Sequence, residues 1–134
     1  MNSYTFTYKV NLDDLDYMGI VGNSDWLIFL ERARIDLLEK IELPFSEMVK
    51  QKIGGVVEEA NIKFIKPAFF DDQLKINIMP HDPFSKGFVL RYFVTNQRGE
   101  ECLTADITII FVDQNGVSTD VPKTISDKLF GKYN

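Results

Sequence analysis

Apolar and polar residues follow two different periods along this chain. Between Tyr4 and Val10, aromatic or apolar positions alternate with polar ones, which is typical of a half-buried strand. From Ser24 to Ile41, apolar residues recur every three or four positions, which predicts one long helix with a wide apolar stripe. Asn23 or Ser24 is the expected N-cap of that helix, because both side chains can accept a hydrogen bond from the first turn.

Strand patterns dominate the second half of the chain. Pro44 is expected to end the long helix, residues 45–50 to form a short helical turn, and Gly54-Gly55 to mark a break. Four strand-like stretches separated by turn residues follow. They cover residues 56–65, 73–79, 86–95 and 103–112. Short connections favour antiparallel pairing, and residues 122–129 are expected to form a closing helix. The sequence therefore predicts a single α+β domain over residues 1–134.

Composition narrows the classes of function. The chain has 134 residues and a formal net charge of −5, with no basic run that would follow a phosphate backbone, so nucleic-acid binding is not expected. No signal-peptide pattern is seen at the N-terminus, and no apolar stretch approaches the roughly 20 residues of a membrane span. One cysteine, Cys102, excludes an internal disulfide and fits a reducing compartment. We expect a cytoplasmic protein that does not act at a membrane.

Histidine and cysteine chemistry finds little support in this sequence. His81 is the only histidine, and its place between Pro80 and Asp82 predicts an exposed turn. Cys102 is expected to be a small buried residue and not a nucleophile. A single histidine and a single cysteine argue against a zinc site, so no metal ligands are assigned.

The stretch between the first strand and the long helix holds the most distinctive polar residues. Asp13, Asp14 and Asp16 lie close together there, and Gly19 and Gly22 follow them. Carboxylates at the start of a helix, framed by glycines, can form a small preorganised site. A loop of solvated acids is the alternative interpretation, and the stretch alone does not decide between them.

Two blocks of sequence resemble hotdog-fold thioesterases, most closely the 4-hydroxybenzoyl-CoA thioesterase type. The first block reads Asp-x-Asp-x-x-Gly-x-Val over residues 14–21 and continues as Phe-x-Glu-x-Ala-Arg over residues 29–34. The second covers residues 57–74, with a Pro-Ala turn at 67–68. The resemblance implies a hotdog fold, in which an antiparallel β-sheet wraps around one long central α-helix. It also implies a homodimer or homotetramer with active sites between subunits.

The resemblance also implies a chemistry. The second aspartate of the Asp-x-Asp pair, here Asp16, corresponds to the catalytic carboxylate of the family, which acts as nucleophile or as general base. The backbone N–H of Asn23, at the start of the helix, corresponds to the donor that polarises the thioester carbonyl. Asp13 and Asp14 are interpreted as structural. The expected activity is hydrolysis of acyl-CoA thioesters, without a metal or a bound organic cofactor.

Residues around this centre are candidates for substrate binding. The set consists of Gly19, Gly22, Trp26, Lys63 and Lys66. The glycines would let the backbone approach the substrate, Trp26 would line the acyl or aryl pocket, and the two lysines would contact the phosphates of coenzyme A.

Three positions depart from the family pattern. Many relatives have an aromatic residue where this chain has Leu12, a small hydroxyl or thiol residue in place of Leu15, and His or Tyr in place of Asn23. Leu12 and Leu15 are expected to desolvate Asp16. The departures keep open the alternative of a non-catalytic acyl-CoA-binding hotdog module. A thioesterase for acyl carrier protein is a further alternative, but it predicts a basic docking patch, against which the acidic net charge argues. The identity of the acyl group is not predicted.

Overall fold

The computed structural model describes residues 3–42 and 45–131. In chain order the described elements are β1 (Tyr4–Lys9), the 3₁₀ turn η1 (Leu12–Asp14), α1 (Asn23–Lys40), α2 (Phe45–Gln51), β2 (Ile53–Phe64), β3 (Gln73–Phe84), β4 (Gly87–Thr95), β5 (Glu101–Asp113), β6 (Ser118–Thr119) and α3 (Lys123–Phe130). The predicted order of strand, long helix and strand-rich second half is confirmed.

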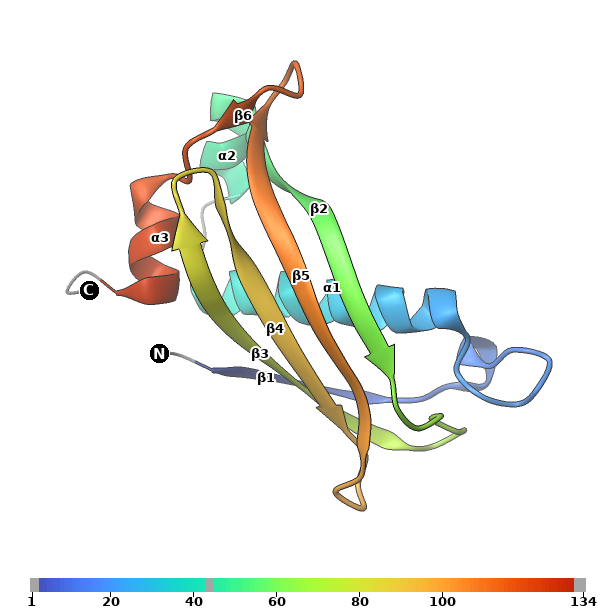
Figure 1. Cartoon of the computed structure of the whole chain (residues 1–134). Helices are drawn as coiled ribbons and strands as arrows, with labels where there is room; N and C mark the ends of the chain where they lie inside the picture. The colour runs from blue at the N-terminus through green and yellow to red at the C-terminus, as the bar shows by residue number, and fades with distance from the viewer. Residues whose placement is uncertain (1–2, 43–44, 132–134) are drawn as a thin grey trace.

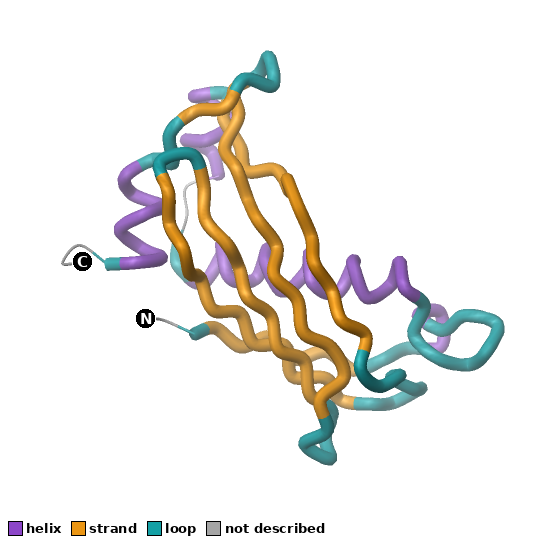
Figure 2. The backbone as a smooth tube through the Cα atoms, in the orientation of Figure 1, coloured by secondary structure: helices purple, strands orange, loops and turns teal. Residues whose placement is uncertain are grey.

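The strands form one antiparallel sheet in the order β1-β3-β4-β5-β2, and the short β6 pairs with β5. Figure 1 shows α1 crossing one face of this sheet, with α2 and α3 near the end of the sheet that lies close to the C-terminus of α1. The loop before α1 lies at the opposite end of the helix, which Figure 2 shows from the same side. The expected α+β class is thus confirmed.

The core lies between α1 and the sheet. Alternate residues of β5 from Leu103 to Phe111 are buried and face the helix side. From α1, the buried side chains are Trp26, Phe29, Leu30, Ala33 and Leu37. Leu27, predicted to belong to the same stripe, is 47% exposed, because the buried side is centred on Leu30 and Leu37. One flank of α1 therefore keeps apolar side chains that a single chain does not cover.

Several predicted boundaries are wrong. The N-cap of α1 is Gly22, and Asn23 is the first helical residue. Residues 54–55 do not break the chain but lie inside β2. In β2, a side chain at position 55 would meet the Cγ2 atom of Ile109 at 3.0 Å, so this glycine permits a close approach of strand and side chain.

The predicted turn at Pro80–Pro83 is also wrong, because β3 continues to Phe84. Beyond Ile78, β3 has no pairing with β1, and a strand edge tolerates prolines because no ladder hydrogen bond is lost there. His81 therefore lies within a strand and not in a turn. Its side chain is only 15% exposed and lies between the carboxylates of Asp82 and Asp106. The expectation that Cys102 is buried is confirmed.

In the part of the chain that the structure describes, no helix combines the length and the apolar character needed to cross a membrane.

Candidate active site

Asp14 fixes the start of the loop that precedes α1. Its carboxylate is buried and accepts hydrogen bonds from the Tyr8 hydroxyl at 2.7 Å and from the backbone N–H of Asn11 at 2.8 Å. Burial and the hydrogen bond to Asp14 together raise the pKa of Tyr8 above its usual value. The acid thus joins β1 to η1, and Asp14 has the structural position that the sequence predicted.

Asp16 lies in a compact turn that its own backbone and side chain hold together. Its N–H donates to the carbonyl of Ile20 at 2.8 Å, and its carbonyl accepts from the N–H of Gly19 at 3.0 Å. The Oδ1 atom accepts a hydrogen bond from the N–H of Met18 at 2.8 Å. Within the described part of the chain, Oδ2 makes no hydrogen bond. One carboxylate oxygen is therefore anchored and the other is available to a substrate or a water.

Gly19 allows this turn to close. Its φ angle is +78°, in the left-handed region that a residue with a side chain adopts only at a cost in energy. A Cβ atom at this position would touch nothing within 4 Å, so backbone conformation and not space requires the glycine. Gly19 thereby shapes the turn that holds Asp16.

The N-terminus of α1 lies next to Asp16. Gly22 is the N-cap and no side chain caps the helix, so the N–H groups of the first turn keep no acceptor within the helix. A Cβ atom on Gly22 would lie 3.7 Å from the Cβ of Asp16 and 3.1 Å from Oδ2 of Asp25. The absent side chain at position 22 thus leaves the space between the Asp16 carboxylate and the start of the helix open.

Asp25 also belongs to this site, although no sequence motif indicated it. Its half-buried carboxylate lies beside Gly22, on the side of that residue that also faces Asp16. The motif gave no signal for it, because its proximity to Asp16 depends on how the loop turns back at Val21 towards the helix. Leu15 and Val21 form an isolated bridge that sets this turn.

Exposed apolar side chains surround the loop. The segment that follows β2 lies beside the loop, and the two are joined by a hydrogen bond from the N–H of Val21 to the carbonyl of Ala68 at 2.9 Å. The exposed large apolar residues on these two segments are Leu12, Tyr17, Met18, Ile65, Phe69 and Phe70. Leu12 is 69% exposed and Asp16 is itself exposed, so the expected desolvation of Asp16 does not arise within one chain.

The other predicted substrate-binding residues lie in different surroundings. Trp26 is 3% exposed and packs edge-on against Phe29 in the core. The ammonium group of Lys66 forms an ion pair with Glu100 at 2.6 Å. Lys63 lines a shallow groove on the face of the sheet away from α1, together with Arg91. Of the predicted set, the structure brings Asp16, Gly19, Gly22 and Asn23 together. Trp26 is instead buried, Lys66 is paired with Glu100, and Lys63 lies on the face of the sheet away from α1.

Comparison with known proteins identifies the family. The model of the thioesterase-like superfamily matches residues 10–129 of the chain. The long-chain acyl-CoA thioesterase FadM of Escherichia coli (strain K12) is 33% identical over 106 residues, which cover 78% of this chain and 80% of FadM.

Solved structures agree on the fold. The 1,4-dihydroxy-2-naphthoyl-CoA thioesterase of Synechocystis superposes with a TM-score of 0.88 at 18% identity and covers 96% of both chains. A mutant 4-hydroxybenzoyl-CoA thioesterase complexed with 4-hydroxybenzoyl-CoA gives a TM-score of 0.87 at 24% identity, covering 95% of this chain and 98% of the other. The resemblance noted in the sequence is confirmed: the chain belongs to the thioesterase-like superfamily and has the hotdog fold.

Proposed function

We propose that this protein hydrolyses acyl-CoA thioesters, with Asp16 as the catalytic carboxylate and the backbone N–H of Asn23 as the donor to the thioester carbonyl. The observation that carries this proposal is the position of Asp16 beside the uncapped N-terminus of α1, with one carboxylate oxygen anchored and the other without a partner in the described chain. Similarity to acyl-CoA thioesterases such as FadM supports the substrate class.

The arrangement suits attack on a thioester carbonyl. A carbonyl oxygen at the N–H of Asn23 would meet an unpaired donor and the positive end of the helix dipole, both of which favour the negative charge that develops on that oxygen. Asp16 would then either take a proton from an attacking water or attack the carbonyl carbon itself. In both routes the carbon–sulfur bond breaks and coenzyme A leaves as its thiol; the second route passes through a mixed anhydride that water hydrolyses.

Binding of the remainder of the substrate is assigned as follows. Gly22 places no side chain between Asp16 and the start of α1, where the reacting carbonyl would lie, and Gly19 shapes the turn around Asp16. Trp26 would form a wall of the acyl pocket, and Lys63 and Lys66 would contact the coenzyme A phosphates. For Lys66 this means sharing its ammonium group between phosphate and Glu100.

We further propose that the working unit is a homodimer, or a pair of dimers. Among the described strands, β2 has a partner on one side only, so its other edge is free. Val57, Ala60 and Phe64 lie opposite buried residues of β5 and thus face the side of α1, yet all three are exposed. A second copy paired along β2 would bury this apolar strip together with the uncovered flank of α1.

Adjacent valines of β2 test the dimer. Val56 and Val57 are both exposed but lie on opposite faces of the sheet. Val57→Lys is expected to shift the protein from dimer to monomer in sedimentation velocity, because a charge would enter the apolar contact, whereas Val56→Lys serves as the matched control. A wild-type chain that sediments as a monomer at micromolar concentration would rule the proposed dimer out.

The hydrolase proposal is tested by thiol release from a panel of aliphatic and aromatic acyl-CoAs. Asp16→Asn is expected to lower kcat about 10²- to 10⁴-fold with an unchanged melting temperature, because it removes the base or nucleophile and keeps the shape. Asp13→Asn, in the same loop and also exposed, is the matched control and should retain wild-type activity. If Asp16→Asn kept its activity, the proposed role of Asp16 would be refuted. If the wild type bound acyl-CoA saturably without hydrolysing it, the protein would be a binding module.

A further inference from the structure

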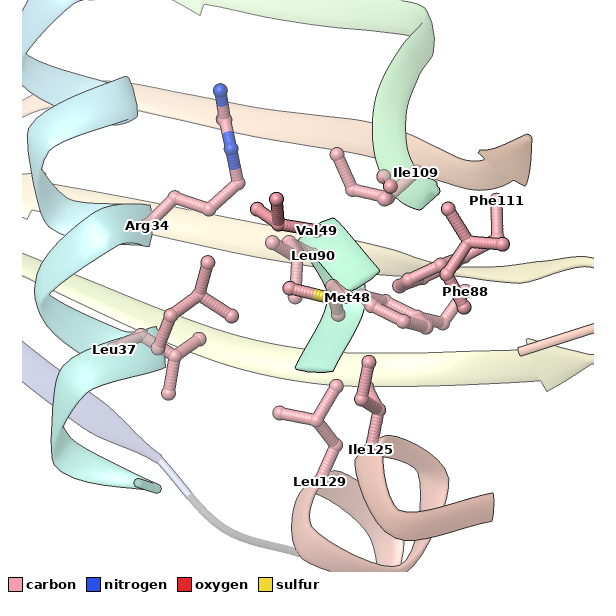
Figure 3. A pocket seen from close by; sticks show the side chains of 14 residues that line it. Arg34, Leu37, Met48, Val49, Phe88, Leu90, Ile109, Phe111, Ile125 and Leu129 are labelled. Carbon is pink, nitrogen blue, oxygen red and sulfur yellow. The ribbon is translucent and has the colours of Figure 1, made fainter. Parts of the chain in front are cut away.

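A second concave site lies at the other end of α1, where the C-terminal half of that helix, α2, α3 and the sheet meet. It is a cavity of about 240 Å³, lined by 14 of the described residues. Figure 3 shows Met48 and Val49 of α2 in the middle of the view and Ile125 and Leu129 of α3 below them. Engineered apolar cavities of roughly 150 Å³ already bind benzene, so this volume admits an aliphatic chain.

Among the described residues that line the cavity, Arg34 is the only charged one. Its Nη1 atom donates a hydrogen bond to the hydroxyl of Tyr92 at 3.2 Å, and Tyr92 is itself fully buried in the core. Among the side chains that the structure describes, no carboxylate forms an ion pair with Arg34, and its described contact is the hydrogen bond to Tyr92. A guanidinium carries five N–H donors in a planar fork that matches a carboxylate, so most of its donors remain unused by the described chain.

Apolar walls with one cation at the side are the features of a site for an amphipathic anion. Such pockets gain affinity from burial of the apolar part and orientation from a few polar groups. In Figure 3 the guanidinium lies at one side of the space, and Ile125 and Leu129 lie at the opposite side. A ligand with a carboxylate at one end and a flexible hydrocarbon tail at the other fits this division.

We propose that this cavity binds a single-chain aliphatic carboxylate, with the carboxylate paired to Arg34 and the tail between the sheet, α2 and α3. The site is separate from the one at Asp16. Arg34 lies 11 residues beyond Asn23 in α1, which at 1.5 Å per residue places it about 16 Å further along the helix axis. The proposal does not depend on the hydrolase activity proposed above, although aliphatic carboxylates are also a class of product of that reaction.

The test is direct binding of decanoate to the full chain. Calorimetry measures the binding, and NMR of decanoate labelled with ¹³C at the carboxyl group monitors the bound carboxylate. Saturable binding of one decanoate per chain is expected, with decanol binding more weakly because it lacks the charge. In a pH titration, the bound carboxyl should titrate at a lower pH than free decanoate, since a neighbouring guanidinium favours the ionised form. This readout needs no variant and reports the pairing itself.

Variants then locate the site. Arg34→Gln is expected to weaken decanoate binding at least about tenfold, and Arg34→Lys less, because lysine keeps the charge but not the fork. Val49→Trp, which places a large side chain at the exposed edge of the cavity, should weaken binding without a loss of stability. Asp16→Asn should leave binding unchanged. Absence of saturable binding would overturn the proposal, as would binding that Asp16→Asn abolishes and Arg34→Gln retains, since decanoate would then occupy the Asp16 site.

Discussion

At the N-terminal end of α1, hydrogen bonds of the backbone and of two aspartates hold the loop, and the key carboxylate of Asp16 is exposed. At the C-terminal end, apolar side chains from three helices and the sheet surround a cavity, and Arg34 is the one charged residue among its described lining. Substitutions in the loop at the N-terminal end of α1 can alter its surface with little loss of core packing. Apart from exposed edge residues such as Val49, substitutions around the cavity cannot, because its walls include core residues such as Leu90 and Leu129. Substitutions at the two ends should therefore differ in what they damage.

The largest effect on folding is expected at the cavity end. Leu90 is 2% exposed on β4 and lines the cavity. Leu90→Ala should lower the free energy of unfolding by about 2–5 kcal/mol, because it removes buried methyl groups and enlarges a space that already exists. Urea denaturation followed by circular dichroism measures this. The surface substitution Leu12→Ala, at the loop end, is the matched control and should change stability by less than about 0.5 kcal/mol.

The loop end should instead lose activity while the fold is retained, and Asn23 offers a sharp test. Proline is favoured at the first position of a helix, where its missing N–H leaves no helical hydrogen bond unmade, and Gly22 already has the extended conformation that precedes proline. Asn23→Pro should therefore fold normally but lower kcat about 10²- to 10³-fold, the effect of losing one oxyanion donor.

Asn23→Ala is the control for this substitution, because it removes only the side chain and keeps the backbone N–H. Thiol release by Asn23→Ala should stay close to the wild-type rate. If instead the alanine variant were inactive and the proline variant active, the donor would be the Asn23 side chain and not the backbone.

The difference between the two ends also explains what the sequence could and could not predict. The loop is local: the residues that hold Asp16 lie within a few positions of it, so a motif over residues 14–21 was enough to single out Asp16 as a candidate. The N-cap was misplaced because Gly22 has no side chain that signals a cap. The cavity is non-local, since its walls come from segments between Arg34 and Leu129, and no spacing along the chain reveals that they meet.

The strand β3 shows the same limit. Prolines and aspartate between residues 80 and 83 predicted a turn, which is correct as a statement of local preference. Pairing with β4 overrides that preference, because no described strand pairs with β3 on its other side beyond Ile78 and prolines there cost no hydrogen bond of the described ladder. His81 consequently lies in the sheet beside Asp106, an environment that its sequence neighbours do not suggest.

The smallest expected effect concerns an exposed charge cluster close to the loop end. Hydrogen bonds from Lys66, Asn96 and Arg98 hold the pKa of Glu100 at about 2, below its usual value of 4.5. Because the folded pKa is the lower one, the ionised carboxylate stabilises the fold above about pH 4.5, and this contribution is lost as the pH falls from 4.5 towards 2. Exposure keeps the contribution small.

Glu100→Gln should therefore lower the melting temperature slightly at pH 7, and its difference from the wild type should shrink as the pH falls below 4.5. Differential scanning calorimetry between pH 3 and pH 7 is the measurement, and Glu101→Gln, at the exposed neighbouring position, is the matched control. A difference in melting temperature that stays constant across the pH range would show that Glu100 acts through packing and not through its charge.

The same variant also tests Lys66. Glu100→Gln would release the ammonium group of Lys66 from its ion pair, so a lower KM for acyl-CoA in this variant would support the proposed contact of Lys66 with the phosphates.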